Sequence, residues 1–248
     1  MARPKGILQV NGTLGELSFY DSVYGPIVRT KGGPSAEQIK KSKKFVRVRE
    51  HNAEFKGCAV AGKALRIALH PLLKHVKDHR LVWRVTKLMS DLKNADIVSV
   101  RGKRNVMQGL ATNEGKALLK NFDFNSQAVL DQILVKKIKV DSAGAMSLKG
   151  LKPVPDLKSP KGATYVSFKG ARLRVDLVKE KAELFESREV KLKLDKKASD
   201  VLLNPGGKPT FAGADLYLVH ICFLQEINGV DYLLSNGEFT ALSVVGVK

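Results

Sequence analysis

Two histidines, His75 and His79, have the spacing in this 248-residue chain that most resembles a site for chemistry. Residues four apart share one face of a helix, where two imidazoles can bind the same metal ion. A zinc site needs three or four ligands, and the sequence around this pair shows no third one. Lys74, Lys77 and Arg80 would also repel a cation. We therefore predict solvated or structural histidines and no bound metal.

A second candidate is the Gly32-Gly33-Pro34-Ser35 segment, which precedes a predicted helix. The N–H groups at a helix N-terminus can bind an anion. The segment lacks the Gly-Lys-Ser/Thr ending of a P-loop, and Pro34 has no N–H group to donate. Ser35 with Gln38 three residues later forms a capping box, which explains these residues without a ligand.

The remaining reactive side chains form no catalytic motif. Cys58 and Cys222 lie far apart without a CxxC pair, which predicts two core residues rather than a disulfide or a thiolate zinc site. The sequence contains no GxSxG, HExxH or paired-carboxylate arrangement. We predict a protein that is not an enzyme and that holds no cofactor.

Positive charge is the strongest signal in the composition. The formal net charge is +19, and residues 1–124 contribute +14 of it, with 24 Lys and Arg against 10 Asp and Glu. Such an excess indicates an acidic partner: nucleic acid, an anionic membrane face or an acidic protein surface. A solvated basic face is the alternative explanation.

The charge is concentrated on one predicted helix and one short loop, which we predict to be the partner-binding residues. They are Lys40, Lys41, Lys43, Lys44, Arg47, Arg49, Arg101, Lys103 and Arg104. Our first hypothesis is a binding or structural subunit that docks on a large acidic protein. The alternative is a cytoplasmic protein associated with nucleic acid or ribosomes. Few aromatic residues accompany the basic ones, which disfavours stacking on single strands but not contacts with phosphates.

The elements that position these residues fall into a helical half and a β half. Residues 7–31 predict a β meander, with turns at Asn11-Gly12 and around Tyr24 to Pro26. A three-helix unit is expected over about residues 35–95, with one helix after Ser35, one over 61–72 and one from about Asp78. Residues 118–124 indicate a last helical turn or a docking segment.

Beyond residue 125 the apolar period changes from 3.6 to 2. Short alternating strands are predicted around 138–140, 173–177 and 190–194, and further strands around 230–234 and 239–247. The strand over 216–224 is apolar on both faces, as expected of a central strand. This pattern is typical of an antiparallel sandwich of immunoglobulin-like type. We predict an α+β protein with a meander and helical domain over 1–124 and a β-sandwich domain over 125–248.

The N-terminal stretch and the lengths of the apolar runs indicate in which compartment the protein is expected. The N-terminus has only the short apolar stretch Ile7 to Val10, which Gln9 interrupts and which is shorter than the roughly 7–15 residues of a secretory signal. No run approaches the roughly 20 residues of a membrane span. By sequence we expect a cytoplasmic protein without a transmembrane segment.

The stretches MARPKGILQVNGTLGELSFY and VRTKGGPSAEQIKKSKKFVRVREHNAEF resemble the start of small basic proteins frequent in the Bacteroidota. In that family a GxLG-x-SFY hairpin precedes a VRT…P[ST]xEQ helix start. The resemblance covers roughly the first 75 residues, and the β half follows it only in outline. It implies no enzyme activity. It also implies a role like that of the plug subunit of the type 9 secretion translocon, at the periplasmic opening of an outer-membrane channel.

Overall fold

The computed structural model describes residues 10–30 and 32–248, apart from the side chains of residues 235 and 236. The chain divides into two compact units, Met1–Arg49 and Glu50–Lys248. This boundary differs from the one expected between residues 124 and 125. The helices after residue 50 pack on the β-sheet and share a core with it.

The first unit contains the predicted β meander, with strands β1 (Gly12–Leu14), β2 (Leu17–Ser22) and β3 (Gly25–Thr30). The strands pair antiparallel in the order β1-β2-β3. Residues 7–9 of the predicted first strand lie outside the described residues. Two short helices follow, α1 (Ala36–Lys41) and the 3-10 turn η1 (Lys43–Phe45). The predicted capping box is present, because the Ser35 hydroxyl accepts from the Gln38 N–H and the Gln38 side chain accepts from the Ser35 N–H.

A single long helix, α2 (Val46–Ala68), occupies the region where the sequence predicted parts of two helices. The helices that follow in the second unit are α3 (His70–Leu73), α4 (Leu81–Asn94), α5 (Val106–Ala111), α6 (Asn113–Leu119), α7 (Leu130–Ile133) and α8 (Pro153–Asp156).

The second unit also contains two antiparallel sheets. Their strands are β4 (Lys139–Val140), β5 (Met146–Leu151), β6 (Tyr165–Asp176), β7 (Lys181–Glu186), β8 (Val190–Lys193), β9 (Ser199–Leu203), β10 (Ala214–Ile227), β11 (Val230–Leu233) and β12 (Ala241–Val247), with a 3-10 turn η2 (Leu234–Gly237) before the last. The fold is α+β, as predicted.

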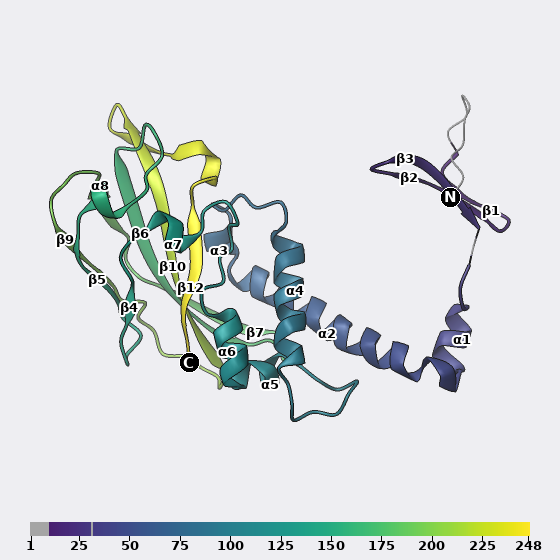
Figure 1. Cartoon of the computed structure of the whole chain (residues 1–248). Helices are drawn as coiled ribbons and strands as arrows, with labels where there is room; N and C mark the ends of the chain where they lie inside the picture. Colours follow the sequence, from purple (N-terminus) through teal and green to yellow (C-terminus); the bar gives the residue numbers. More distant parts are fainter. Residues whose placement is uncertain (1–9, 31) are drawn as a thin grey trace. The chain divides into compact units, whose positions relative to one another are not determined.

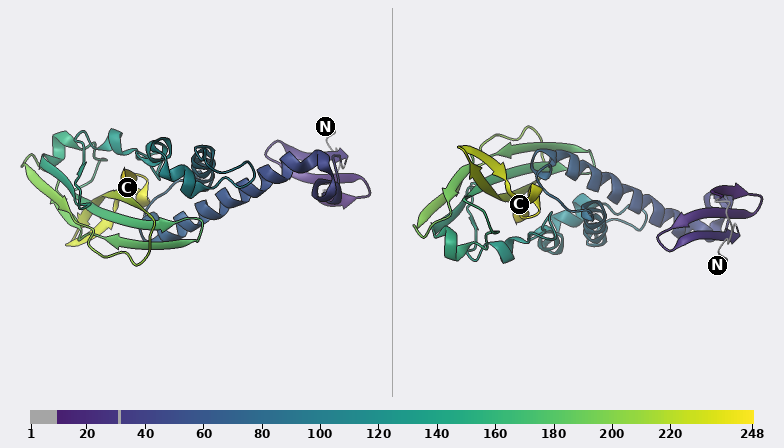
Figure 2. Two further views of the ribbon diagram at one scale, coloured as in Figure 1. Left: turned by 90° about the horizontal axis from the view of Figure 1, so that it is seen from below. Right: turned by 90° about the horizontal axis from the view of Figure 1, so that it is seen from above.

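The large sheet is built on β6 and β10, which lie side by side over most of their length (Figures 1 and 2). The outer edge of β6 pairs with β7 and then β8, and the outer edge of β10 pairs with β12 and then β11. Residues 121–124 extend the sheet beyond β12, because the N–H groups of Asn121 and Phe124 donate to Val244 and Leu242.

Each face of the large sheet is covered by a different layer. Leu216 and Leu218 of β10 pack among the buried residues of α2, α4, α5 and α6. Their neighbours Tyr217 and Val219 point to the other face and pack against β5 and β9 of the small β4-β5-β9 sheet. The strict alternation of side chains along a strand therefore divides one strand between two cores. This explains why the predicted central strand is apolar on both faces.

Helices α5 and α6 were not predicted, because each is too short to show a helical period. Both are capped by side chains, with Asn105 accepting from the Gln108 N–H and Thr112 accepting from the Gly115 N–H. The backbone of α4 lies against α5 at a glycine: a Cβ on Gly109 would be 1.7 Å from the carbonyl oxygen of Leu92. None of the helices in the described part of the chain has the length and apolar character needed to cross a membrane.

Two glycine substitutions test this packing. Gly109→Ala should lower the free energy of unfolding by at least about 2 kcal/mol, because the added methyl group meets backbone atoms that must move apart. Gly57→Ala is the matched control, since Gly57 lies inside α2 with no atom within 4 Å of an added Cβ. It should raise stability by about 0.5–1 kcal/mol through helix propensity. Chemical denaturation measures both, and equal effects would contradict the close contact of α4 with α5.

Candidate functional site

The predicted basic helix is found as the exposed segment 36–49, which contains six cations and one acid, Glu37. Lys41 pairs with Glu37 at 3.3 Å, where both side chains are in solvent. Lys40, Lys43 and Lys44 are exposed, and within the described residues no ion pair involves them. Three adjacent ammonium groups are thus available to a partner.

Arg49 has a structural role in this segment. One nitrogen of its guanidinium, Nη1, donates to the carbonyl oxygens of Ile39 at 2.7 Å and Ser42 at 2.8 Å. Carbonyl groups at the end of a helix lack partners within the helix, so a cation there satisfies them and opposes the helix dipole. Arg49 therefore holds the end of α1 in place, while Arg47 is exposed on the surface.

The three other predicted residues belong to the loop between α4 and α5, in the second unit. Arg101 is exposed and pairs with Glu50 at 3.6 Å, and Lys103 is exposed. Arg104 turns inward to Glu54 of α2. Its Nε and Nη2 atoms donate to the two carboxylate oxygens of Glu54, each at 2.9 Å. This bidentate pair makes Arg104 part of the loop's support rather than an open cation.

Glu54 is the centre of a buried polar cluster. Its side chain is 2% exposed and also accepts from the Gly102 N–H at 2.7 Å and from Lys93 Nζ at 3.1 Å. The hydrogen bond from Arg104, together with those from Gly102 and Lys93, lowers the pKa of Glu54 to about 2 against the opposing effect of burial. Cys58, which lines a cavity of about 140 Å³ beside this cluster, has a pKa raised by burial. Because the Cys58 thiol is protonated and the Glu54 carboxylate is fully paired, we interpret this cluster as structural.

The two candidate histidines are not a pair. His79 is exposed before α4, whereas the ring of His75 lies 6.1 Å from the ring of His220 in β10. His220 was not among the predicted site residues, although a lone histidine inside the apolar run of residues 216–224 is a visible signal. Within residues 10–30 and 32–248, no three His, Cys, Asp or Glu side chains are grouped closely enough to hold a metal ion.

His75 and His220 lie beside a hollow of about 260 Å³ at one end of the large sheet. The residues around it include His75, Ser167, Lys169, Glu189, His220 and Cys222. His220 is 6% exposed, and its Nε2 atom has no hydrogen-bond partner in the described structure. Burial, helped by the positive charges of His75 and Lys169, lowers the pKa of His220 to about 4. The imidazole is therefore neutral at pH 7.

The other groups around this hollow are also held in unreactive states. The Ser167 hydroxyl donates to the carboxylate of Glu189 instead of to a histidine. Burial raises the pKa of the Cys222 thiol to about 11, so no thiolate nucleophile is present at neutral pH. The hollow thus has the residue types of a hydrolase site, but no serine–histidine or cysteine–histidine hydrogen bond joins these residues in the described part of the chain.

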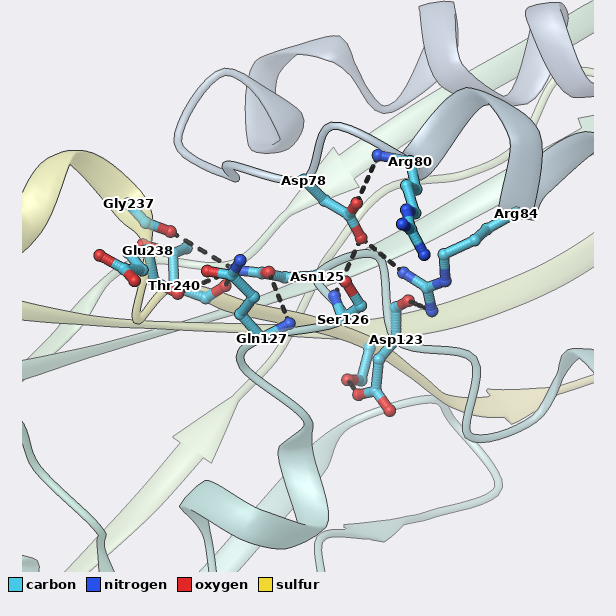
Figure 3. Close-up of polar contacts among 11 residues, drawn as sticks. Asp78, Arg80, Arg84, Asp123, Asn125, Ser126, Gln127, Gly237, Glu238 and Thr240 are labelled. Carbon is cyan, nitrogen blue, oxygen red and sulfur yellow. Dashed lines mark hydrogen bonds and ion pairs between the residues drawn. The ribbon is translucent and has the colours of Figure 1, made fainter. Parts of the chain in front are cut away.

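A network of polar contacts joins the residues before α4 to residues 123–126 and to the turn before β12 (Figure 3). Asp78 accepts from the Arg80 N–H, from Arg84 Nη1 and from the Ser126 N–H, and Arg84 also donates to the Asp123 carbonyl. The Asn125 amide donates to the carbonyl groups of the turn before β12. These contacts tie the start of α4 to residues 123–126 and to η2, so the network stabilises the fold.

A lysine-rich hollow in the second unit was not among the predicted sites. It has a volume of about 670 Å³ and lies along β4 and β5. Lys137, Lys139 and Lys149 line it, and all three are exposed and without an ion pair in the described part of the chain. Its sequence signal was the alternation of lysines with Ile138 and Val140, which we used only to predict a strand.

Replacing the buried carboxylate should change stability in a defined pH range. Glu54 has a lowered pKa, so its charge stabilises the fold above pH about 4.5, and this contribution is lost as the pH falls towards about 2. Glu54→Gln should lower the free energy of unfolding at pH 7 by about 3 kcal/mol, because Lys93 and Arg104 lose their counter-charge. Denaturant titrations from pH 7 to pH 2 measure this. A variant with unchanged stability at pH 7 would show that the cluster contributes nothing.

His220 should affect the free energy of unfolding in a different pH range. Its lowered pKa means that protons bind the unfolded chain first, so stability falls as the pH drops from about 6.5 to about 4. In His220→Gln this fall, about 3 kcal/mol in the wild type, should be largely removed, while the loss below pH 4.5 due to Glu54 remains. The same titrations measure it. An unaltered slope between pH 6.5 and 4 in the variant would contradict a buried neutral imidazole.

No protein-family model, no curated protein and no solved structure matches this chain. Its function is therefore inferred from the charges, contacts and exposures of its own residues.

Proposed function

We propose that this protein is a non-enzymatic binding subunit that docks on a large acidic protein through the exposed lysines of segment 36–49. The observation that carries the proposal is the set of Lys40, Lys43 and Lys44, which are exposed in a segment with a single acid. Charges without partners lose no intramolecular ion pair when they meet an acidic surface, and they steer its approach.

The segment is also held in shape before any partner binds. The Ser35–Gln38 capping box fixes the start of α1, and Arg49 fixes its end. Ser42 begins η1 by accepting from the Lys44 N–H. Pre-organised cations lose less conformational entropy on binding than cations on a flexible tail, which favours a docking role over simple solubilisation.

The resemblance of the N-terminal stretch to the Bacteroidota family gives the partner a specific form. We propose an outer-membrane translocon channel of the type 9 secretion system, whose periplasmic opening this subunit would close. The support is the hairpin GTLGELSFY, present here as β1 and β2, which resembles the GxLG-x-SFY hairpin with one additional residue before SFY, and the matching helix start, present as the capped α1. Purification of the channel with or without this chain attached tests the assignment.

Nucleic-acid binding is the second candidate, and the lysine hollow at β4 and β5 favours it. Lys137, Lys139 and Lys149 present three cations along one open surface, which suits a phosphate backbone. No aromatic side chain lines this hollow, so the contact would be with phosphates rather than with bases.

A charge-reversal series separates the two functions. In the triple variant Lys40→Glu, Lys43→Glu, Lys44→Glu, we expect recovery of the acidic partner by co-purification and its association rate to fall by about tenfold or more. The matched control Lys196→Glu, Lys197→Glu, Lys208→Glu reverses three exposed lysines elsewhere and should leave both unchanged. If the two variants had equal partner recovery and equal association rates, segment 36–49 would be only a solvated face.

Duplex DNA and single-stranded RNA provide the second arm of this series. Binding that persists at physiological salt, with a slope of about −0.9 per phosphate contact in a log–log salt plot for duplex, would favour the nucleic-acid function. In that case the triple variant Lys137→Glu, Lys139→Glu, Lys149→Glu should lower both the affinity for nucleic acid and the magnitude of the slope in the salt plot. Absence of binding to either nucleic acid leaves the acidic protein as the partner class.

A further inference from the structure

The loop between α4 and α5, residues 95–105, exposes three aliphatic side chains in a row of four residues. Ile97 is 85% exposed, Val98 is 77% exposed and Val100 is 68% exposed. Single exposed apolar residues are common on proteins, but a group of large ones at one point marks an interaction site. We define these three residues as the aliphatic tip.

The aliphatic tip is held by hydrogen bonds at both ends of the loop. One oxygen of Asp96 accepts from the N–H groups of Val98 at 3.0 Å and Ser99 at 2.9 Å, and the other accepts from the Asn105 N–H at 3.0 Å. Burial alone would raise the pKa of Asp96, but the hydrogen bonds from Ser99 and Asn105 lower it below its usual value. The carboxylate is therefore ionised and fully used inside the loop.

The second support of the loop is Glu54, which accepts from Gly102 and Arg104. Gly102 has a φ of +88°, and a Cβ there would be 2.9 Å from the Cγ of Glu50, so the loop backbone lies directly on α2. Figure 1 shows this loop extending beyond the ends of α4 and α5. Two buried carboxylates thus fix the base of a loop whose tip points into solvent, at the energetic cost of exposing apolar side chains.

The exposed charge beside the aliphatic tip is positive. Arg101 and Lys103 follow Val100 directly and are both exposed. Asp96 is the only acid within residues 95–105, and it is 3% exposed. An approaching surface therefore meets aliphatic groups at the tip and cations behind them.

We propose that this loop inserts its aliphatic tip into an anionic lipid surface, with Arg101 and Lys103 at the level of the head groups. Aliphatic side chains partition into the acyl boundary, and nearby cations add attraction to anionic lipids. A protein interface fits less well. Such interfaces bury about 800 Å² on each partner and are enriched in Tyr, Trp and Arg anchors, whereas this tip is small, convex and without aromatic residues.

Vesicle binding tests the proposal with the full chain. The wild type should sediment with vesicles of phosphatidylcholine and phosphatidylglycerol, and bind vesicles of phosphatidylcholine alone much more weakly. The variant Ile97→Ser, Val98→Ser, Val100→Ser should lose at least tenfold in affinity for the anionic vesicles. Arg101→Gln with Lys103→Gln should lose roughly fivefold per cation. The matched control Val135→Ser, Val178→Ser, Leu202→Ser removes three exposed aliphatic groups elsewhere and should bind like the wild type.

Insertion itself is measured with a fluorescent label. Cys58 and Cys222 are buried, so Val98→Cys provides one accessible thiol for an environment-sensitive dye. Its emission should shift to the blue with anionic vesicles, whereas a dye on Leu202→Cys should not shift. The proposal is overturned if the wild type does not bind anionic vesicles or if the tip variant binds as tightly as the wild type. It is also overturned if the emission of the dye at position 98 does not shift when anionic vesicles are added. The segment variant Lys40→Glu, Lys43→Glu, Lys44→Glu tests the acidic-protein function separately, since it leaves the tip intact.

Discussion

The pairing of β6 with β10 is the constraint on which the second unit depends. Eleven residue pairs from Ala214 to Leu224 place these strands in one continuous antiparallel register. Since side chains alternate between faces, a slip by one residue would exchange the helix-facing and sheet-facing sets along the whole strand. Both sets are apolar, but they fit different layers: Leu218 packs among helices, and Val219 packs against β5 and β9. The register therefore decides which side chains of the two strands face the helices and which face the small sheet.

The sequence predicted the elements whose period is long and unambiguous. The β meander and the α+β class follow from turn dipeptides and apolar periods, and the strand around Leu216 to Leu224 follows from a continuous apolar run. The boundary between units could not be predicted in this way. The helices of residues 50–119 bury their apolar residues on a sheet that begins more than 40 residues later in the chain, and periodicity gives no information on which partner covers a helix. The short helices α5 and α6 could not be predicted because their capping residues, Asn105 and Thr112, are also common in turns.

The basic residues show why composition alone cannot identify a binding surface. Lys40, Arg49 and Arg104 contribute the same charge to the net value of +19, yet one is exposed, one closes a helix and one is paired with a buried carboxylate. The signal that separates them is the position of a partner group, and those groups lie 7 to 50 residues away in the chain. His220 presents the opposite case. It looks like an ordinary member of an apolar strand until the fold brings His75 beside it.

The short segment at residues 121–124 has a consequence for how copies of this chain behave together. An open strand edge can recruit the same edge of another molecule and start aggregation. Here the outer edge of β12 already pairs with the backbone of Asn121 and Phe124, so its hydrogen-bonding groups are used within one molecule. On the other side of the sheet, β8 carries the exposed Lys193, whose charge opposes pairing of one β8 with another. Pairing of the sheet with another molecule is therefore opposed at two of its edge strands, at β12 by the chain's own backbone and at β8 by side-chain charge.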